Sequence, residues 1–335
     1  MRLVTAALAA VMAMTAVAAS AQERVKMATI APGSSAYLVM TTMASIVNDA
    51  QDQVEISVDA TGAATKHQVE AAQGKLDIFM SSPTIYHLMA NGQAMYLNLA
   101  SAPELSNNVR LLFWFPYGAY HIVAYDGSGI ETMADLRDKK VFLGPPGGGA
   151  FNTAKAWVET NTGMVPGEDF ESVKASWGSA LQGFQDRQFD VYISGGIPPY
   201  PQIEQLALTS KIRLIGLSGA DYENASDEVK TETTKLGRTV EIIPEGIYGE
   251  NVVSNGDVYT VGATVGVAAR ADLDEEKVYL MTKTFWENLP EAQANAPYLN
   301  EVSLEVALRS DRMKLHPGAL RYYEEIGLEI PEAMR

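Results

Sequence analysis

Apolar runs of strand length recur along the chain, and each ends in small polar residues that lead into a helical pattern. These runs predict strands at residues 25–30, 54–60, 76–80, 141–143, 173–175 and 189–193. The first three and the last three have similar spacing, since Gly33 and Gly62 stand as far apart as Gly147 and Ser176. The pattern therefore predicts an α/β protein with two similar lobes, each with three strand-to-helix corners.

Such corners favour ligand binding, because parallel βα units bind ligands beyond the carboxyl ends of their strands. The helices that begin there present unpaired backbone N–H groups and a partial positive charge, which suit an anion. Ordinary βα turns are the alternative for any one corner, since Gly, Ser and Thr are common in them. Taken together, we expect the six corners to meet in one cleft between the lobes.

The chain is predicted to cross between the lobes twice. Strands at residues 109–115 and 121–125, around a turn at residues 116–118, mark the first crossing, and an alternating run at residues 258–269 marks the return. A helical tail from Glu275 should pack back on the first lobe. We therefore predict a discontinuous lobe one, of residues 22–119 and 260–335, and a lobe two of residues 120–259, joined by a two-segment hinge.

The first residues predict export. Residues 1–21 combine a short basic start, an apolar stretch and a small-residue cleavage site, which is typical of a signal peptide cleaved before Gln22. A retained membrane anchor is the alternative, although the stretch is short for a span. The chain has no Cys, which excludes disulfides, zinc–thiolate sites, Cys nucleophiles and lipid attachment to Cys. A periplasmic protein that is not embedded in the membrane fits these features.

The formal net charge of −16 argues against nucleic-acid binding, which needs a basic face. The four histidines, His67, His87, His121 and His316, lack zinc-motif spacing, and residues 144–149 are followed by no Lys-Ser or Lys-Thr pair of a P-loop. Gly33-Ser34-Ser35 is not a nucleophile elbow. We expect neither a metal nor a cofactor.

The candidate ligand contacts of lobe one are the polar residues at its corners. Lys66 is the basic residue of the six corners, and its ammonium would give a carboxylate a charge-assisted hydrogen bond unless it is merely solvated. Serines at these corners either cap helices or turn a hydroxyl toward the ligand. The predicted contacts are Ser34, Ser35, Tyr37, Thr65, Lys66, Ser81 and Ser82.

Lobe two offers backbone N–H groups, one amide and aromatic rings. Trp177 stands in a polar turn, where it either covers an aliphatic part of the ligand or packs between loop and lobe. Glycines at these corners allow close backbone approach, and the tyrosines are either rim or core residues. The predicted contacts are Gly148, Gly149, Ala150, Asn152, Trp177, Gly195, Gly196, Tyr200 and Tyr248.

Residues 129–136 and 140–149, with similar stretches at 243–248 and 316–325, resemble the TAXI family of TRAP-transporter solute-binding proteins. The resemblance implies a type II periplasmic binding-protein fold of two α/β lobes. It also implies capture of a small organic anion and its delivery to sodium-coupled TRAP membrane subunits, expected to be fused. The corners at residues 31–37, 61–67 and 147–150 depart from the usual family loops.

These observations predict a monomeric, non-enzymatic periplasmic receptor for a small organic acid. No Asp or Glu stands in the six corners to meet an ammonium group, which favours 2-oxoglutarate or a simple C4/C5 dicarboxylate over glutamate. A secreted α/β hydrolase or transferase is one alternative. A receptor for an ABC importer or a sensor kinase is another, because docking surfaces lack short sequence signatures.

Overall fold

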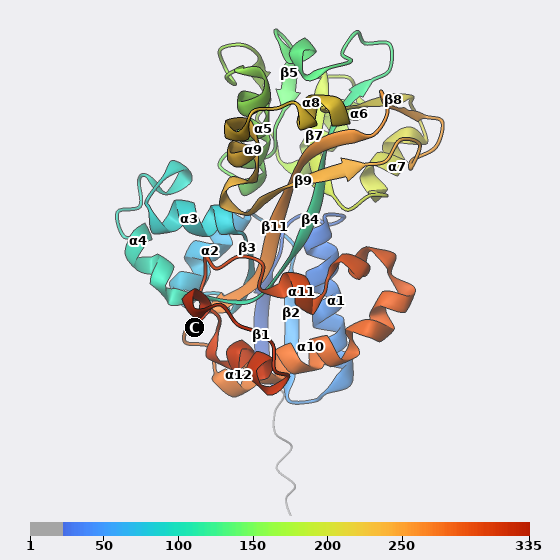
Figure 1. Cartoon of the computed structure of the whole chain (residues 1–335). Coiled ribbons are helices and arrows are strands. Elements are labelled where there is room, and N and C mark those ends of the chain that lie inside the picture. The colour runs from blue at the N-terminus through green and yellow to red at the C-terminus, as the bar shows by residue number, and fades with distance from the viewer. Residues whose placement is uncertain (1–22) are drawn as a thin grey trace, which may run out of the picture.

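The computed structural model describes residues 23–335, and the predicted signal peptide lies outside the described residues. Figure 1 shows two lobes, one above the other, linked by two long strands that run through both. All strands belong to one mixed sheet, whose main path has the order β2-β1-β3-β11-β4-β7-β5-β6. The predicted fold class, two α/β lobes of the periplasmic binding-protein type, is confirmed.

The lower lobe in Figure 1 is a parallel βα arrangement, in which β1 pairs with both β2 and β3. Its strands are β1 (Glu23–Ala28), β2 (Val54–Asp59) and β3 (Ile78–Ser81), and its first helices are α1 (Ser35–Ala50), α2 (Ala64–Ala72), α3 (Pro83–Ala90) and α4 (Ala102–Leu105). The tail adds α10 (Glu275–Asn295), α11 (Leu304–Ala307) and α12 (Pro317–Glu325). The tail therefore packs on the first lobe, because α10 contacts α1 and α12 contacts β4.

Sequence signals explain where these helices begin. Ser34 caps α1 by accepting the N–H of Tyr37, and Met40, Met43 and Val47 form the buried stripe of that helix. Pro83 opens α3 at a first-turn position, where its missing N–H costs nothing. Each of these helices is the next element after its strand, so its first turn lies at the upper edge of the lobe (Figure 1).

The upper lobe repeats the arrangement with shorter strands. These are β5 (Lys140–Phe142), β6 (Glu171–Ser172), β7 (Val191–Gly196), β8 (Ile212–Ile215), β9 (Arg238–Ile243) and β10 (Val252–Val253). Its helices are α5 (Gly149–Thr162), α6 (Trp177–Gln185), α7 (Pro201–Ala207), α8 (Gly219–Glu223) and α9 (Asp227–Thr234). The predicted strand at residues 173–175 is wrong, because the regular pairing with β5 ends at Ser172 and only the N–H of Val173 continues it.

The two linking strands are β4 (Val109–Tyr125) and β11 (Val258–Arg270), which pair antiparallel with each other. The turn predicted at residues 116–118 is wrong, since β4 continues through it. Partners on both sides hold the backbone extended: Pro116 lies opposite Thr264 of β11, and Ala119 lies opposite Gly196 of β7. Gly118 absorbs the local distortion with a φ of +96°.

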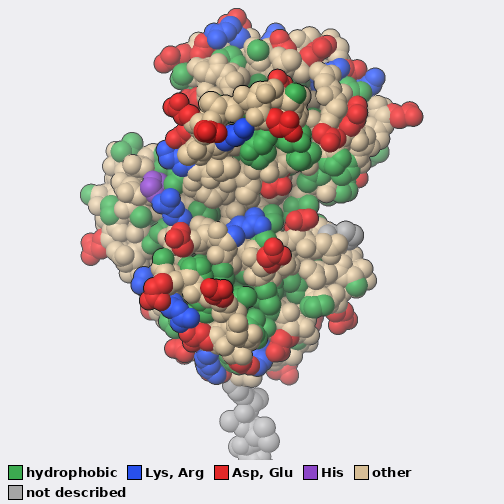
Figure 2. All heavy atoms as spheres, viewed as in Figure 1, with side chains coloured by type: hydrophobic (Ala, Val, Ile, Leu, Met, Phe, Trp, Pro, Cys, Tyr) green, Lys and Arg blue, Asp and Glu red, His purple; other side chains and the backbone are tan. Residues whose placement is uncertain are grey.

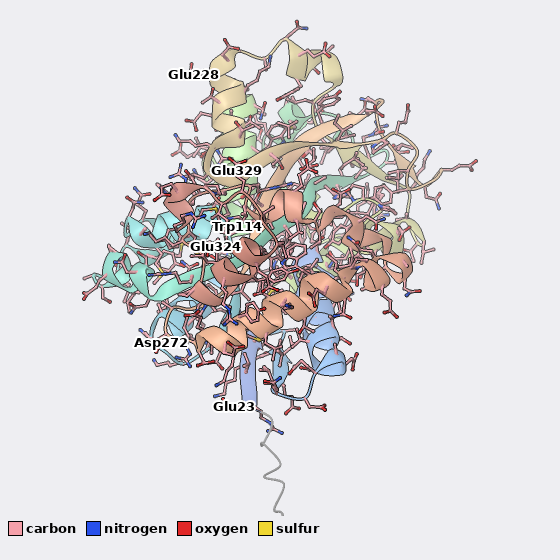
Figure 3. All side chains as sticks on the ribbon, turned by 60° about the horizontal axis from the view of Figure 1, so that its bottom comes forward. Glu23, Trp114, Glu228, Asp272, Glu324 and Glu329 are labelled. Carbon is pink, nitrogen blue, oxygen red and sulfur yellow. The ribbon has the colours of Figure 1, made fainter. Side chains whose placement is uncertain are left out.

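The core of the lower lobe forms around β4 and the tail helices. Phe113 stacks on Phe285 of α10 with ring centroids 4.8 Å apart, and the Trp114 indole N–H donates to the Ser310 carbonyl at 2.8 Å. Trp114 is fully buried and lies toward the middle of the view in Figure 3, whereas Glu23 and Asp272 lie toward its edge. The strands that link the lobes are thus anchored firmly in one of them.

Candidate ligand-binding site between the lobes

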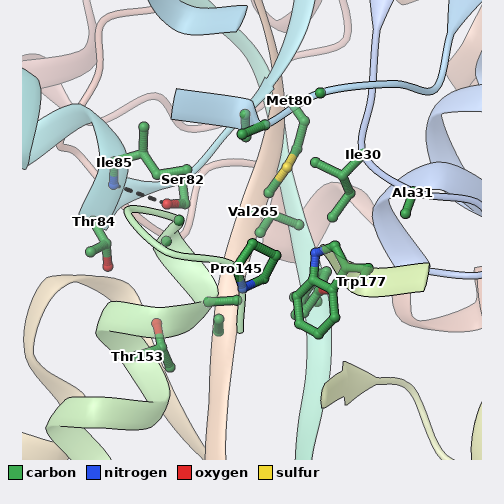
Figure 4. A pocket seen from close by; sticks show the side chains of 18 of the residues that line it. Ile30, Ala31, Met80, Ser82, Thr84, Ile85, Pro145, Thr153, Trp177 and Val265 are labelled. Atoms are coloured by element: carbon green, nitrogen blue, oxygen red, sulfur yellow. Dashed lines mark hydrogen bonds between the residues drawn. The ribbon is translucent and has the colours of Figure 1, made fainter. Parts of the chain in front are cut away.

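A cavity of about 420 Å³ lies between the lobes, at the edge where the strand-to-helix corners meet (Figure 4). Five of the six predicted corners contribute to it, and β4 and β11 form its back. Its lining comprises Ile30, Ala31, Ala60, Gly62, Ala63, Ala64, Met80, Ser82, Thr84, Ile85, Tyr117, Tyr120, Pro145, Gly148, Gly149, Ala150, Thr153, Ser176, Trp177, Gly178, Ala263, Thr264 and Val265. Of the predicted contacts, Ser82, Gly148, Gly149, Ala150 and Trp177 are brought together here.

Two helices of different lobes begin at this cavity without a side-chain cap. Ala63 precedes α2 and Gly148 precedes α5, and neither has a side chain that accepts a hydrogen bond from the first turn. The backbone N–H groups of a first turn have no partner within the helix. Both helix starts therefore offer hydrogen-bond donors and partial positive charge to a ligand in the cavity.

Ser82 lies at the start of α3, facing the second lobe. Its hydroxyl oxygen accepts the Ile85 N–H at 3.0 Å, which leaves its own proton free to donate to a ligand. The lobes approach each other closely at this corner. A Cβ added to Gly149 would lie 3.0 Å from Cγ1 of Ile85, so the absence of a side chain at Gly149 permits the approach.

Trp177 is the first residue of α6, a helix capped by the preceding Ser176. Its indole packs edge-on against Phe142, with ring centroids 5.4 Å apart, and remains partly exposed. Figure 4 shows it beside Pro145 and across from Ile30. Trp177 thus packs on its own lobe and also forms a wall of the cavity.

Direct hydrogen bonds also hold the two lobes together. The Ser35 hydroxyl of α1 accepts the N–H of Ile197 from the other lobe at 3.2 Å. A second hydrogen bond between the lobes runs from the Thr84 hydroxyl, which donates to the Leu236 carbonyl at 3.1 Å. Hydrogen bonds thus join the two lobes directly at two separate places.

Several predicted contacts in lobe one do not line the cavity. Ser34 is occupied as the cap of α1, and the buried Ser81 donates to Gln68 at 2.6 Å. Tyr37 lies on α1, and Thr65 is buried in α2 with its carbonyl bonded to the Tyr96 hydroxyl. These residues belong to the corners but do not line the cavity.

Lys66 also points away from the cavity. Its side chain is 72% exposed, and its ammonium lies 3.4 Å from the Glu70 carboxylate one turn further along α2. A helix turns about 100° per residue, so Ala64 faces the cavity and Lys66 faces solvent. The expected ammonium–carboxylate contact with the ligand is absent from this geometry.

Gly195 and Gly196 are strand residues of β7, paired with Tyr120 and Ala119 of β4. A Cβ on Gly195 would lie 2.4 Å from the Tyr117 ring, and one on Gly196 would lie 2.3 Å from the Tyr200 ring. The glycines are thus explained by the packing of tyrosine rings on the strand. The sixth corner consequently stays outside the cavity.

Tyr200 and Tyr248 belong to a buried network in lobe two. The Tyr248 hydroxyl accepts the Tyr200 N–H at 2.8 Å and lies 2.6 Å from Nε2 of His121, while Nδ1 of His121 lies 3.0 Å from the Ala119 carbonyl. Burial lowers the pKa of His121 to about 3, so the ring is neutral. Burial also raises the pKa of Tyr200 to about 12. These residues are structural, and Asn152 similarly bonds to the Gly148 carbonyl within α5.

Most of the cavity wall was missed by sequence reasoning. Tyr117 and Tyr120 come from β4, where the sequence predicted a turn at residues 116–118, and Val265 comes from β11, where the sequence shows only strand patterning. Burial raises the pKa of both tyrosines, so they are neutral phenols. The sequence around these three residues contains no motif of a binding site. The position at which two linking strands pass behind a cleft depends on the tertiary structure, and neighbouring residues do not reveal it.

The cavity has no ionisable Asp, Glu, Lys, Arg or His side chain among the described residues that line it. Within residues 23–335 no cluster of three or more His, Asp or Glu side chains is arranged to hold a metal ion. Over the same residues, no helix combines the length and apolarity needed to span a bilayer. Figure 2 shows acidic and basic side chains interspersed over both lobes on one face of the molecule.

A two-lobed α/β protein with a cavity between its lobes has the architecture of periplasmic solute-binding proteins. Residues 27–327 match the NMT1-like family, and the chain belongs to that family.

Solved structures with a similar fold include the periplasmic aliphatic sulphonate binding protein SsuA from Escherichia coli, with 14% identity, coverage of 91% of this chain and 88% of that chain, and a TM-score of 0.45. A TRAP periplasmic solute binding protein from Xanthobacter autotrophicus Py2 with bound β-D-galacturonate is 11% identical, with coverage of 91% and 88% and a TM-score of 0.47. The periplasmic ectoine-binding protein of the TeaABC TRAP transporter of Halomonas elongata is 15% identical, with coverage of 90% of each chain and a TM-score of 0.45.

Proposed function

We propose that this protein is a periplasmic solute receptor that captures a small organic acid in the interlobe cavity and delivers it to a TRAP-type secondary transporter. One observation carries the proposal: two uncapped helix starts, from α2 of one lobe and α5 of the other, line the same interlobe cavity. An anion between them would receive hydrogen bonds from both lobes at once. A ligand that bridges the lobes stabilises their closed arrangement.

The proposed working cycle is a hinge motion about β4 and β11. We place the lobe boundaries near residues 119–120 and 259–260, where these strands pass from one lobe to the other. In the open form, water would replace the hydrogen bonds of Ser35 and Thr84 across the lobes. Ligand shifts the population toward the closed form, because only that form makes contacts with it from both sides.

The choice of TRAP transport rests on the resemblance of residues 129–136 and 140–149 to the TAXI family, and the periplasmic location rests on the predicted signal peptide. An organic acid is favoured by the helix starts. The narrower preference for 2-oxoglutarate or another C4/C5 dicarboxylate relied partly on Lys66, which lies outside the cavity. The helix starts now carry the anion argument alone.

A hydrolase or transferase would need a nucleophile in contact with a base. Among residues 23–335, the hydrogen-bond partners of the histidine rings include Asn91, the Ala119 carbonyl, Tyr248 and the Gly318 N–H, together with backbone groups of Thr61, Ser194 and Leu273. No Ser hydroxyl is among these partners. The geometry thus favours a receptor over this alternative.

Titration calorimetry and small-angle scattering test the proposal directly. The mature protein would be titrated with 2-oxoglutarate, succinate, fumarate, glutamate and a monocarboxylate, and its radius of gyration measured with and without each acid. We expect stoichiometric binding of at least one acid, with compaction and no chemical turnover. Failure of every organic acid to bind at millimolar concentration, or tightest binding of a neutral solute, would contradict the proposal.

Gly149→Val supplies a variant that acts on closure. The added side chain would meet Ile85 across the lobes, where even a Cβ would lie 3.0 Å from Cγ1. We expect this variant to remain folded and to lose ligand-induced compaction. Gly149→Ala, which adds only that Cβ, should show an intermediate loss.

A further inference from the structure

Several polar side chains that line the cavity lie together on one side of it. Figure 4 shows Ser82 and Thr84 of α3 on this side, with Thr153 of α5 below them. The start of α5 belongs to the same corner, because the Cβ position of Gly149 lies 3.9 Å from the Ser82 hydroxyl oxygen. The Ser82 hydroxyl and the backbone N–H groups at the start of α5 converge here as donors, as an anionic group requires. The Thr84 hydroxyl lies on the same side, but its proton is already donated to the Leu236 carbonyl.

The opposite side of the cavity is apolar. Ile30, Met80, Val265 and the Trp177 indole lie toward the centre and the other side of the view in Figure 4. Met80 and Val265 are buried, with 5% and 3% of their surfaces exposed. No cationic side chain lines the described cavity, so a second carboxylate placed against these four side chains would meet hydrocarbon and no counter-charge.

On the apolar side of the cavity, a charged end and an apolar end of a ligand should change the binding affinity in opposite directions. Each methylene that becomes buried is worth about fourfold in affinity. An unpaired carboxylate in the same place loses its hydration without compensation, which weakens binding by about 100-fold or more. The cavity therefore discriminates mainly at the end of the ligand that lies against Met80 and Trp177.

We propose that the cavity selects a monoanion with an apolar body, a carboxylate or a sulfonate, over a dicarboxylate. The anionic group lies at the Ser82 corner, and the apolar body lies against Met80, Val265 and Trp177. This inference rests on the proposed function, since it specifies the ligand class of the same cavity. It replaces the C4/C5 dicarboxylate preference that the sequence suggested.

Matched six-carbon probes test the inference by calorimetry at pH 8, where all carboxyls are ionised. Hexanoate and adipate differ in one terminal carboxylate, hexanamide lacks the charge, and hexane-1-sulfonate changes the anionic group. We expect hexanoate or hexane-1-sulfonate to bind at least tenfold more tightly than both adipate and hexanamide. The member of this pair that binds more tightly identifies the natural head group.

Adipate binding as tightly as hexanoate and hexane-1-sulfonate would overturn this inference and leave the organic-acid receptor intact. If no organic acid of either kind binds, the proposed function fails and the inference fails with it. Tighter binding of hexanamide would also contradict both. The two failures are thus distinguishable.

Met80→Lys is designed to reverse the selectivity, because it places an ammonium on the apolar side. We expect the ratio of adipate to hexanoate affinity to rise at least tenfold in this variant. Met80→Gln, of similar length and without charge, is the matched control and should leave the ratio within about threefold of the original. An unchanged ratio in a folded Met80→Lys variant would overturn the inference.

Trp177 variants keep the test independent of whether Met80→Lys folds. Trp177→Ala removes an apolar wall and should weaken hexanoate at least tenfold, whereas Trp177→Phe retains a ring and should lose less than fivefold. Trp177 is also a built-in reporter, since Trp114, Trp157 and Trp286 are buried and Trp177 is partly exposed at the cavity. Full hexanoate affinity in Trp177→Ala would contradict the proposed orientation.

Discussion

Ser35→Ala isolates the energetics of lobe closure from ligand contact. Ser35 does not line the cavity, is 4% exposed, and accepts the N–H of Ile197 across the lobes at 3.2 Å. Without that hydroxyl, the N–H would be left without a partner in the closed form, whereas water would satisfy it in the open form. The cost of an unsatisfied buried donor is about 1–2 kcal/mol. The ratio of closed to open protein should therefore fall roughly 5- to 30-fold.

Calorimetry with the tightest ligand measures the consequence, because apparent affinity falls with the population of the closed form. We expect weaker binding within that range and less compaction by small-angle scattering at subsaturating ligand. Ser45→Ala is the control, since Ser45 lies on the exposed face of the same helix and donates to Asp49. Wild-type affinity and compaction in Ser35→Ala, with stability retained, would refute the assignment of this hydrogen bond to closure.

Three further predictions concern a charge, a pH dependence and a backbone conformation. Lys66→Gln should leave affinity for the anionic ligand within about twofold by calorimetry, because the ammonium is paired with Glu70 outside the cavity. Burial lowers the pKa of His121 from 6.5 to about 3, so its contribution to stability is complete above pH 6.5 and is lost as pH falls toward 3. His121→Gln should therefore remove about 2 kcal/mol from the drop in unfolding free energy between pH 7 and pH 5, measured with urea. Gly118→Ala should destabilise by more than about 2 kcal/mol, because φ is +96° and the Cβ would lie 2.3 Å from the backbone of β7, whereas Gly127→Ala, with open space around it, should cost about 1 kcal/mol.

Local sequence signals predicted the repeating architecture well. Strands were expected at residues 25–30, 54–60 and 76–80, each followed by a helix, and the structure has β1, β2 and β3 there with α1, α2 and α3 after them. Such features depend on neighbours a few residues away, so the sequence displays them directly. The turn predicted at residues 116–118 failed for the opposite reason, since the strand is kept extended by pairing with β11 and β7, which are distant in the chain.

The candidate site was predictable at the level of corners but not of side chains. Gly148, Gly149 and Ala150 were expected at the cavity and lie there, because a helix start after a strand has a fixed direction. Gly195 follows the same sequence rule, yet serves to accommodate the Tyr117 ring. A glycine that permits ring packing and one that permits ligand approach look identical in sequence.

The sequence by itself determined an α/β chain with two sets of helix starts, because periodicity, capping and glycine placement act over a few residues. Only the tertiary structure decided which of those starts face one another, that Lys66 turns to solvent, and that Tyr117, Tyr120 and Val265 form the back of the cavity. The reason is physical. The cavity is lined by segments that are far apart in the chain, such as those of Ile30 and Val265, which are 235 residues apart. Whether a charged side chain points into the cavity depends on the rotation of its helix about the helix axis.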